Sequence, residues 1–501
     1  MVWRPKRLRP AAAAGLLLFA LSACGVTDDV VCLDSYCASQ EGGRYIDHLQ
    51  FDAASYKPEP TLRQENVRSV RTVNKGLFQH DPLQSYAEAI LDRIVAAGPA
   101  SQARPDLVIA ANNSLNAQCL PGGVIVIHHS LFKYLDNEEQ FAFILSHEYA
   151  HYLLDHFSFF DRLRPYALTA AELVVSLQSE GDNDDWRQLL KVYGSDILAR
   201  DLLYPAWSRR KEDEADRLGV DLMARAGYNP AGAQEFLEIL SDYEAAVGRH
   251  AEVELNKLEA ELAIKFGDED PDSPVDQRTG KVDLSGFLFK KGYQAFRNMQ
   301  QTFSARHEEA AQRAAAVLAY VERDYEDESF RDRPTAGWTR AVTASRTVLA
   351  SYDAAFDVIS ALESEDVSPQ DLTRLESKAR QAVTGPTESD SYTRLAFFEL
   401  RLKQRKFDLA ERNLDVALEK DPQPSFQIIQ GKAKILEEQG DPKAAFDLLD
   451  QQSDQYDWPL STYLTMIRLA PQVGQQNRRF DLVTSCAFKY PQSQFACRSV
   501  K

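Results

Sequence analysis

Apolar residues recur along most of this chain with the spacing of amphipathic helices, and one short stretch has the pattern of a strand. The run 141–145 is entirely apolar and follows Asp136 and Glu139, which form an N-cap and a capping box for a helix that begins near Asn137. The β-branched run 124–127 follows a Gly-Gly turn and predicts a strand. We therefore expect a mainly α-helical protein with a small β-sheet.

A second helical pattern begins at about residue 388. It consists of helix pairs at 395–403 with 407–419, 425–439 with 441–452, and 460–469 with 477–489. Ala410 and Ala444 are ~34 residues apart, which is the period of a tetratricopeptide repeat. We expect a tetratricopeptide-like repeat domain whose helix pairs stack into a groove that binds other proteins. The alternative is a plain helical cap that stabilises the preceding domain.

One pentapeptide in the first helix has the spacing of a metal site: HEYAH at 147–151. Residues four apart lie one above the other on a helix face, so His147 and His151 can reach one metal ion. Glu148 can lie beside the open coordination position, which is the HExxH arrangement of zinc peptidases with the glutamate as general base. The alternative is a helix with two structural histidines. His156 lies about 140° from the ligand face, so we expect it to support the site or the fold.

A catalytic zinc ion usually takes three protein ligands and leaves one position for water. The best candidate for the third ligand is Glu212, in the charged segment 208–219. Asp216 lies one helical turn further and could accept the N–H of a ligating histidine, which would fix its tautomer. Gly219 would let this helix pack closely on the first. The alternative for the segment is a solvated, charged helix.

These motifs resemble those of the zinc peptidase family that includes the CAAX prenyl endopeptidases and the HtpX-like membrane proteases. The likeness covers roughly residues 80–320 and is closest to periplasmic members that carry a C-terminal repeat domain. The matching segments are HEYAH, then EDEAD at 212–216, NAQCLPGG at 116–123, which is similar to the family's NAxxxPGG, and HEEAAQR at 307–313, which is similar to its HPxxxxR. In the last segment Glu308 replaces the proline.

The resemblance implies one zinc ion per chain, held by His147, His151 and Glu212. Glu148 would be the catalytic base and Asp216 the partner of a ligating histidine. If the strand 124–127 is the edge strand beside the metal, an extended substrate could add to it by β-augmentation. The alternative is an ordinary edge strand of a small sheet.

Two later residues of the resembling segment have less definite roles. His307 could donate a hydrogen bond to the oxyanion of the tetrahedral intermediate. It could instead occupy the open zinc position and hold the enzyme latent, or cap a helix. Arg313 is expected to form a salt bridge rather than to act in catalysis.

The N-terminus has the features of an export signal. Arg4, Lys6, Arg7 and Arg9 form a basic region, and residues 11–20 are apolar. Leu21-Ser22-Ala23-Cys24 then has the form of a bacterial lipobox. We expect cleavage before Cys24 and a lipid on its sulfur; the alternative is an ordinary cleavable signal. No later stretch approaches the ~18–20 apolar residues that span a bilayer. The expected location is the periplasmic face of the bacterial envelope. Gly25 rather than Asp follows the cysteine, which by resemblance to enterobacterial lipoprotein sorting favours the outer membrane.

Charge and cysteine content narrow the class of partner. Loss of residues 1–23 would remove four basic and no acidic side chains, so the net charge falls from −18 to −22, which repels nucleic acid and anionic lipid. Five cysteines besides Cys24 remain for an oxidising compartment. We expect bridges between Cys32 and Cys37 and between Cys486 and Cys497 by proximity. Cys119 would be left over as a small buried hydrophobe.

Length and pattern together predict five segments. They are a signal peptide (1–23), a lipid-anchored tether (24–60), a zinc metallopeptidase domain (61–330), a helical connector (331–387) and the repeat domain (388–501). Acidic insertions at 179–185 and 267–272 interrupt the peptidase region. The first could belong to a flap over the cleft or be a solvated surface loop.

The sequence thus predicts a lipid-anchored periplasmic zinc endopeptidase. It would hydrolyse peptide bonds of envelope proteins in quality control, with a repeat domain that binds a protein partner. The alternative is a chaperone or assembly factor that acts through the repeat groove while the zinc site is latent or silent.

Overall fold

The computed structural model describes residues 43–51, 60–100, 103–157, 209–246, 310–330, 336–362, 367–490 and 494–500. These residues are mainly α-helical with one three-stranded sheet, which confirms the expected fold class. The signal peptide, Cys24, Cys32, Cys37, both acidic insertions and His307 lie outside the described residues, so the expectations for them stay predictions. No helix in the described ranges is long and apolar enough to cross a membrane.

The sheet has the order β1-β3-β2, with β1 parallel and β2 antiparallel to β3. Its strands are β1 (Asp106–Ala110), β2 (Ala117–Leu120) and β3 (Val124–His128). The predicted strand 124–127 is confirmed as β3, but the expectation that it is an edge strand is wrong. Successive side chains of a strand point to opposite faces, and all five residues of β3 are buried. A strand that is buried on both faces belongs in the centre of the sheet. The edge strand next to the helix that carries HEYAH is β2.

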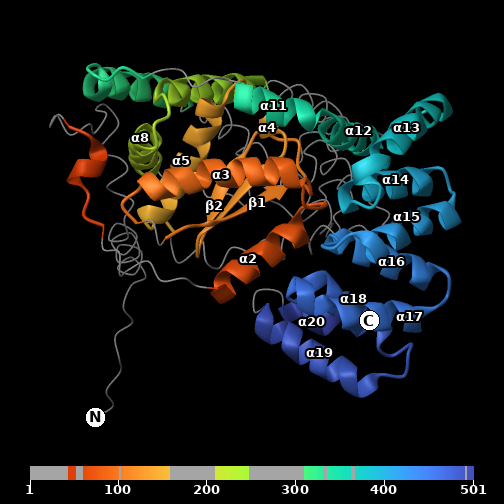
Figure 1. The fold of residues 1–501 in the computed structure, drawn as a ribbon. Coiled ribbons are helices and arrows are strands. Elements are labelled where there is room, and N and C mark those ends of the chain that lie inside the picture. Colours follow the sequence, from red (N-terminus) through yellow and green to blue (C-terminus); the bar gives the residue numbers. More distant parts are fainter. Residues whose placement is uncertain are drawn as a thin grey trace, which may run out of the picture.

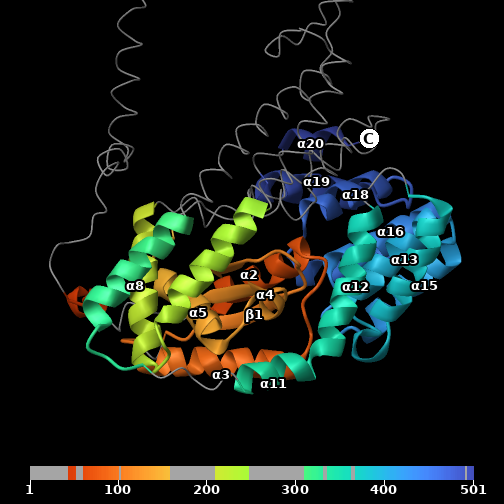
Figure 2. The same cartoon turned by 90° about the horizontal axis from the view of Figure 1, so that it is seen from above.

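Helices cover both faces of this sheet. They are α2 (Pro60–Val73), α3 (Asp81–Ala97), α4 (Leu131–Tyr134) and α5 (Glu138–Leu153). Val70 of α2 shares a small apolar cluster with Val126 of β3. On the other face Ile125 and Ile127 join the main hydrophobic core, to which α3 and α5 contribute. Figure 2 shows the strands between α2 and α3.

The first helix of the metal motif begins one residue later than its capping pattern predicted. The N-cap is Asn137, whose side-chain oxygen accepts the backbone N–H of Gln140 at 2.9 Å. The side chain of Gln140 in turn accepts the backbone N–H of Asp136 at 2.8 Å. The predicted N-cap Asp136 and capping residue Glu139 are therefore wrong, because the amide pair Asn137 and Gln140 satisfies the first turn.

Helix α8 (Arg209–Arg225) packs directly on α5. A Cβ atom at Gly219 would lie 3.1 Å from both the backbone N and the Cα of His147. This separation is shorter than ordinary contact between carbon atoms, so only glycine fits without a shift of the helices. The expectation that Gly219 permits close packing is confirmed.

A buried carboxylate ties α8 to two distant parts of the chain. Asp221 accepts the hydroxyl hydrogens of Tyr320 at 2.8 Å and Tyr325 at 2.6 Å, both on the helix 310–325. It also accepts the backbone N–H of Ile46 at 2.8 Å, in the short 3-10 helix η1 (Tyr45–His48). The charged side chain is thus satisfied by three donors, and the N-terminal segment and the helix 310–325 are fixed on α8.

The C-terminal third of the chain consists of consecutive helices that lie side by side (Figure 1). The first helices are α11 (Ala336–Ala344), α12 (Arg346–Leu362), α13 (Pro369–Ala382) and the 3-10 helix η3 (Gly385–Thr387). They are followed by α14 (Ser391–Lys403), α15 (Phe407–Lys420), α16 (Phe426–Glu438), α17 (Pro442–Gln452), the 3-10 helix η4 (Ser453–Tyr456), α18 (Leu460–Leu469), α19 (Gln476–Lys489) and α20 (Gln494–Ser499). The six helices predicted between 395 and 489 are confirmed. Cys486 and Cys497 form the predicted disulfide, and Cys119 is a free, buried thiol as expected.

The main hydrophobic core does not end at the proposed domain boundaries. It runs from Ile46 to Leu400 and includes Trp338 of α11 and Tyr392 of α14. Helices α12 to α14 are therefore packed against the sheet domain rather than separated from it. The boundaries at 330 and 387 remain predictions.

Buried polar contacts join the sheet domain to the C-terminal helices next to this core. The hydroxyl of Tyr352 donates to Asp390, the N-cap of α14, at 2.5 Å. The side chain of Gln79 donates to Asp421 at 2.6 Å. Burial, together with the nearby Asp421 carboxylate, raises the pKa of Asp390 to about 7, although hydrogen bonds from Tyr352 and the Thr393 backbone oppose this. Asp390 is thus partly protonated near neutral pH, where an ordinary aspartate is fully ionised.

Replacement of Gly219 with alanine should destabilise the protein by about 1–3 kcal/mol, because the added methyl group meets the backbone of His147. The matched control is Gly431→Ala in α16, where the added Cβ would meet only side-chain atoms at 3.3–3.4 Å that can move. The measurement is the urea midpoint of each variant. Equal effects of the two substitutions would contradict the close approach of α8 to α5.

The raised pKa of Asp390 predicts a stability that depends on pH. The unfolded carboxyl titrates near its usual value of about 4, so the stabilisation from the protonated form is full below pH ~4 and is lost as the pH rises through about 7. One pKa unit corresponds to about 1.4 kcal/mol, and the whole effect should not exceed about 4 kcal/mol. Between pH 5 and 8 the wild type should lose stability relative to Asp390→Asn in urea unfolding. A constant difference between the two proteins over this range would show that Asp390 titrates normally.

Candidate metal centre

The two histidines of the pentapeptide lie on one face of α5. His147 and His151 are both buried, and their Nε2 atoms are 3.0 Å apart. The helical spacing of four residues places the rings one turn apart and turns the same nitrogen of each ring toward a common point. The sequence-based expectation of two neighbouring imidazoles in the buried middle of the helix corresponds to this geometry.

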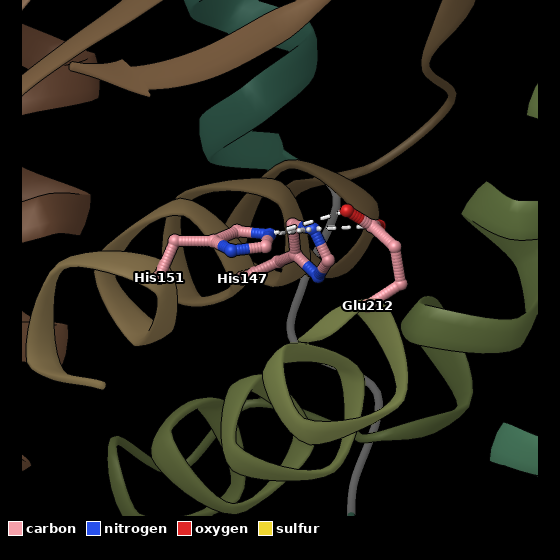
Figure 3. A group of neighbouring side chains, drawn as sticks. All are labelled: His147, His151 and Glu212. Atoms are coloured by element: carbon pink, nitrogen blue, oxygen red, sulfur yellow. Dashed lines mark hydrogen bonds and ion pairs between the residues drawn. The ribbon is translucent and has the colours of Figure 1, made fainter. Parts of the chain in front are cut away.

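Glu212 reaches the same point from the first turn of α8. Its Oε2 atom lies 3.5 Å from Nε2 of His147, and its Oε1 atom lies 3.6 Å from Nε2 of His151. The donor atoms of the three residues all lie within 4.8 Å of one another (Figure 3). The segment that contributes the carboxylate is 61 residues away from His151 in the sequence, and the contact between α5 and α8 brings it back.

Asp216 and Arg313 surround the back of this group. Oδ1 of Asp216 is 2.9 Å from Nδ1 of His147. The guanidinium of Arg313 binds both oxygens of Asp216 at 2.8 Å, and its Nη1 lies 2.8 Å from Oε2 of Glu212. Arg313 thus forms the salt bridge that was expected of it, and it does so with two carboxylates that face the histidines. Although burial opposes it, Arg313 and His147 hold the pKa of Asp216 well below its usual value.

The two imidazoles have opposite electrostatic surroundings. Burial lowers the pKa of His147, but the hydrogen bond and the charge of Asp216 outweigh burial and raise it above its usual value. Burial and the neighbouring His147 hold the pKa of His151 well below its usual value. His151 is therefore a neutral ring whose lone pair is available for binding.

Glu148 lies beside this group with its carboxylate buried. Burial raises its pKa to about 7; the charge of His147 opposes this shift, and that of Glu212 adds to it. The backbone N–H of Cys119 in β2 donates a hydrogen bond to the carboxylate. A carboxyl group with a pKa near neutrality can take up and return a proton at physiological pH.

The chemistry of the donor set fits a metal ion. Nδ1 of His147 faces Asp216, and Nδ1 of His151 faces Nδ1 of His156 at 2.9 Å. If each ring carries its proton on Nδ1, each Nε2 directs a lone pair at the other, and Glu212 adds a third electron-pair donor. Buried lone pairs that converge in this way repel one another unless a cation lies between them. Two imidazole nitrogens and one carboxylate oxygen form a common ligand set of catalytic zinc.

The structure adds contacts that the sequence did not indicate. His156 was expected only to support the site or the fold, and nothing in the sequence pointed to His151 as its partner. Glu214, which accepts from Nε2 of His156 at 3.3 Å, was not singled out, because it lies on a different side of α8 from Glu212. The contact of the Cys119 backbone with Glu148 was not anticipated, because the sequence predicted Cys119 only as a small buried hydrophobe. His307 lies outside the described residues.

Comparisons with known proteins agree with this geometry. Residues 82–321 match the model of peptidase family M48. The β-barrel assembly-enhancing protease of Escherichia coli (strain K12) is 27% identical over 181 residues, which are 35% of this chain and 36% of that protein. The homologue of the same name in Yersinia pestis is 26% identical over 179 residues, or 35% of this chain and 36% of that protein. The mitochondrial metalloendopeptidase OMA1 of Schizosaccharomyces pombe is 26% identical over 219 residues, or 42% of this chain and 62% of that protein.

The alignments to the two bacterial proteases thus span about a third of their length. The residues matched to the family include the whole of α5 and α8, and with them the two histidines and the carboxylate that meet at one point. Peptidases of this family use zinc, in agreement with the donor set. Residues 82–321 therefore form a domain of peptidase family M48.

Proposed function

We propose that this protein is a zinc-dependent endopeptidase with His147, His151 and Glu212 as the metal ligands and Glu148 as the catalytic base. The observation that carries this proposal is the convergence of three donor atoms within 4.8 Å at a buried position. The names of the relatives, a protease and a metalloendopeptidase, support it.

The residues of the site have separable tasks in this reaction. A zinc ion acts as a Lewis acid that polarises a carbonyl and makes water more acidic. Glu148 takes the proton from the attacking water at its carboxylate and returns it to the leaving amine. Burial raises the pKa of Glu148 above its usual value, which makes its carboxylate a better proton acceptor. Asp216 orients His147, and Arg313 balances the charge of the two carboxylates that it contacts.

The outer edge of β2 is the place where an extended substrate would bind. The backbone N–H of His128 donates to the carbonyl of Asn116 at 3.0 Å, so the backbone groups of Asn116 point toward β3. In an antiparallel pair the direction alternates, so the backbone groups of Ala117 and Cys119 point away from β3. Among the described residues no strand pairs with this edge. Since the Cys119 N–H already contacts Glu148, a substrate strand on this edge would lie beside the catalytic base.

The location and the clients are part of the same proposal. A lipid on Cys24 would anchor the protein at the periplasmic face of the bacterial envelope, at the outer membrane, and envelope proteins would be its substrates. The helices α14 to α19 would form a tetratricopeptide-like groove for a protein partner. The name of the Escherichia coli relative, a protease that enhances β-barrel assembly, supports this setting.

Replacement of Glu148 with glutamine should lower the rate of casein cleavage by roughly 10²–10⁴-fold, because the base is lost. The zinc content, measured by elemental analysis, should stay at that of the wild type, since Glu148 is not a proposed ligand. The control is Glu138→Gln at the start of α5, where the side chain contacts Tyr86 and Arg93 instead of the metal group. Chelation should inactivate the wild type, and added zinc should restore it.

The same variant separates the endopeptidase from a chaperone that acts through the repeat groove. Unchanged cleavage by Glu148→Gln would refute the assigned base. If an envelope defect of a deletion strain is fully complemented by Glu148→Gln, binding rather than hydrolysis is the main function. A purified protein without zinc would contradict the metal site itself.

Acylation of Cys24 predicts that the protein incorporates labelled palmitate in a bacterial host. The variant Cys24→Ser should lose the label and move from the membrane fraction to the soluble periplasmic fraction, because the thiol that carries the lipid is gone. Label in the variant equal to that of the wild type would exclude this cysteine as the anchor.

A further inference from the structure

The two proposed ligand histidines are supported by different partners. His147 has the carboxylate of Asp216 at its Nδ1 atom, whereas His151 has a second imidazole, Nδ1 of His156, at 2.9 Å. The rings of His151 and His156 meet edge to face, with centroids 5.0 Å apart. His156 is buried, with 4% of its surface exposed, so water does not compete strongly for this contact.

The chain direction after α5 explains how His156 reaches its position. Asp155 has a φ of +46°, a left-handed conformation that ends the helix and turns the backbone back. The backbone N–H of His156 then donates to the carbonyl of His151 at 3.1 Å, which brings the two residues together so that their rings meet edge to face. The ammonium group of Lys211 on α8 donates to the His156 carbonyl. Both ends of the contact are thus fixed by backbone bonds.

A carboxylate on α8 completes the arrangement. Oε2 of Glu214 lies 3.3 Å from Nε2 of His156, and Arg210 donates to Oε1 of the same carboxylate at 3.0 Å. Arg210 has 79% of its side chain exposed, so the series of contacts extends from the metal position to the protein surface.

Binding of a cation by His151 determines which ring nitrogens of His151 and His156 carry a proton. If Nε2 of His151 binds a metal ion, the remaining ring proton is on Nδ1, which then donates to Nδ1 of His156. His156 consequently carries its proton on Nε2 and donates it to Glu214. Each ring has one defined tautomer, and each nitrogen has one defined role.

We propose that His156, held by Glu214, is a positioning residue that fixes the tautomer and the orientation of His151 and thereby strengthens the binding of the metal ion. This inference rests on the proposed function, in which His151 binds zinc. Partners that fix the outer nitrogen of a ligand histidine typically change metal affinity by 10–100-fold. In this protein a neutral imidazole contacts His151, so no further negative charge lies next to Glu212. The negative charge is on Glu214, which contacts His156 on the side away from His151.

The test is the zinc dissociation constant of the full-length protein without its signal peptide, measured by competition with a chromophoric chelator. His156→Leu removes the acceptor, and the affinity for zinc should fall by about 10–100-fold. In His156→Asn the side-chain Oδ1 atom takes the position of Nδ1, so most of the affinity should return. Glu214→Leu leaves His156 in place without its anchor and should give a smaller loss than His156→Leu.

A buried histidine away from the site provides the matched control. His129 is fully buried, and its Nδ1 atom accepts the backbone N–H of Asn112. His129→Leu should lower the melting temperature and leave the zinc dissociation constant unchanged, which a merely structural role of His156 would also predict for His156→Leu.

Three outcomes distinguish failure of this proposal from failure of the metal site. If the wild type binds zinc and His156→Leu binds it equally tightly, the positioning role is wrong while the site stands. Equal losses in His156→Leu and His156→Asn would also overturn it, because the acceptor atom would then not matter. If the wild type itself binds no zinc, the proposed function fails first.

Discussion

The close contact of α5 with α8 at Gly219 is the constraint on which the rest of the site depends. Glu212, Asp216 and Gly219 are spaced i, i+4 and i+7, so they form one stripe of α8 that faces α5. Because Gly219 has no side chain, the stripe approaches the backbone of His147 itself, and the two carboxylates before it then reach the histidine rings. A larger residue at this position would move both acidic groups away from the rings together.

Burial of so many ionisable groups requires that their charges nearly cancel. The site contains three acidic side chains, Glu148, Glu212 and Asp216, and one arginine, Arg313, which contacts two of them. With all three ionised and the histidines neutral, a divalent cation brings the sum to zero. The same reasoning applies at Asp221, whose single buried charge is offset by three hydrogen-bond donors. The helix that carries Arg313 is held in place by that second group, so the charge balance of the site depends on contacts outside it.

The sequence predicted those features that depend on local periodicity or on a short motif. The helices between 391 and 489, the strand 124–127 and the helix around HEYAH all have a clear spacing of apolar residues, and the structure has them within a few residues. The position of the strand 124–127 within the sheet could not be predicted in this way, because an apolar run does not indicate which strands will flank it. The N-cap was wrong by one residue because Asp136 and Asn137 are both good capping residues, and the side chain of Gln140 decides between them. Glu214 and Asp221 escaped notice because their partners are far away in the sequence or on other elements.

The attachment of residues 45 and 46 to the helix 310–325 and to Asp221 has a mechanical consequence. Gly43 and Arg44 also contact Asp324 and Glu328, so the first described residues of the chain, 43–46, are all held on the fold. With a lipid on Cys24, as proposed, 19 residue steps separate that residue from Gly43, and even a fully extended chain of that length covers at most roughly 60–70 Å. The protease would then be confined to a layer of limited depth next to its bilayer. Tension on the N-terminal segment would reach the helix 310–325, which carries Arg313, before it reaches α8.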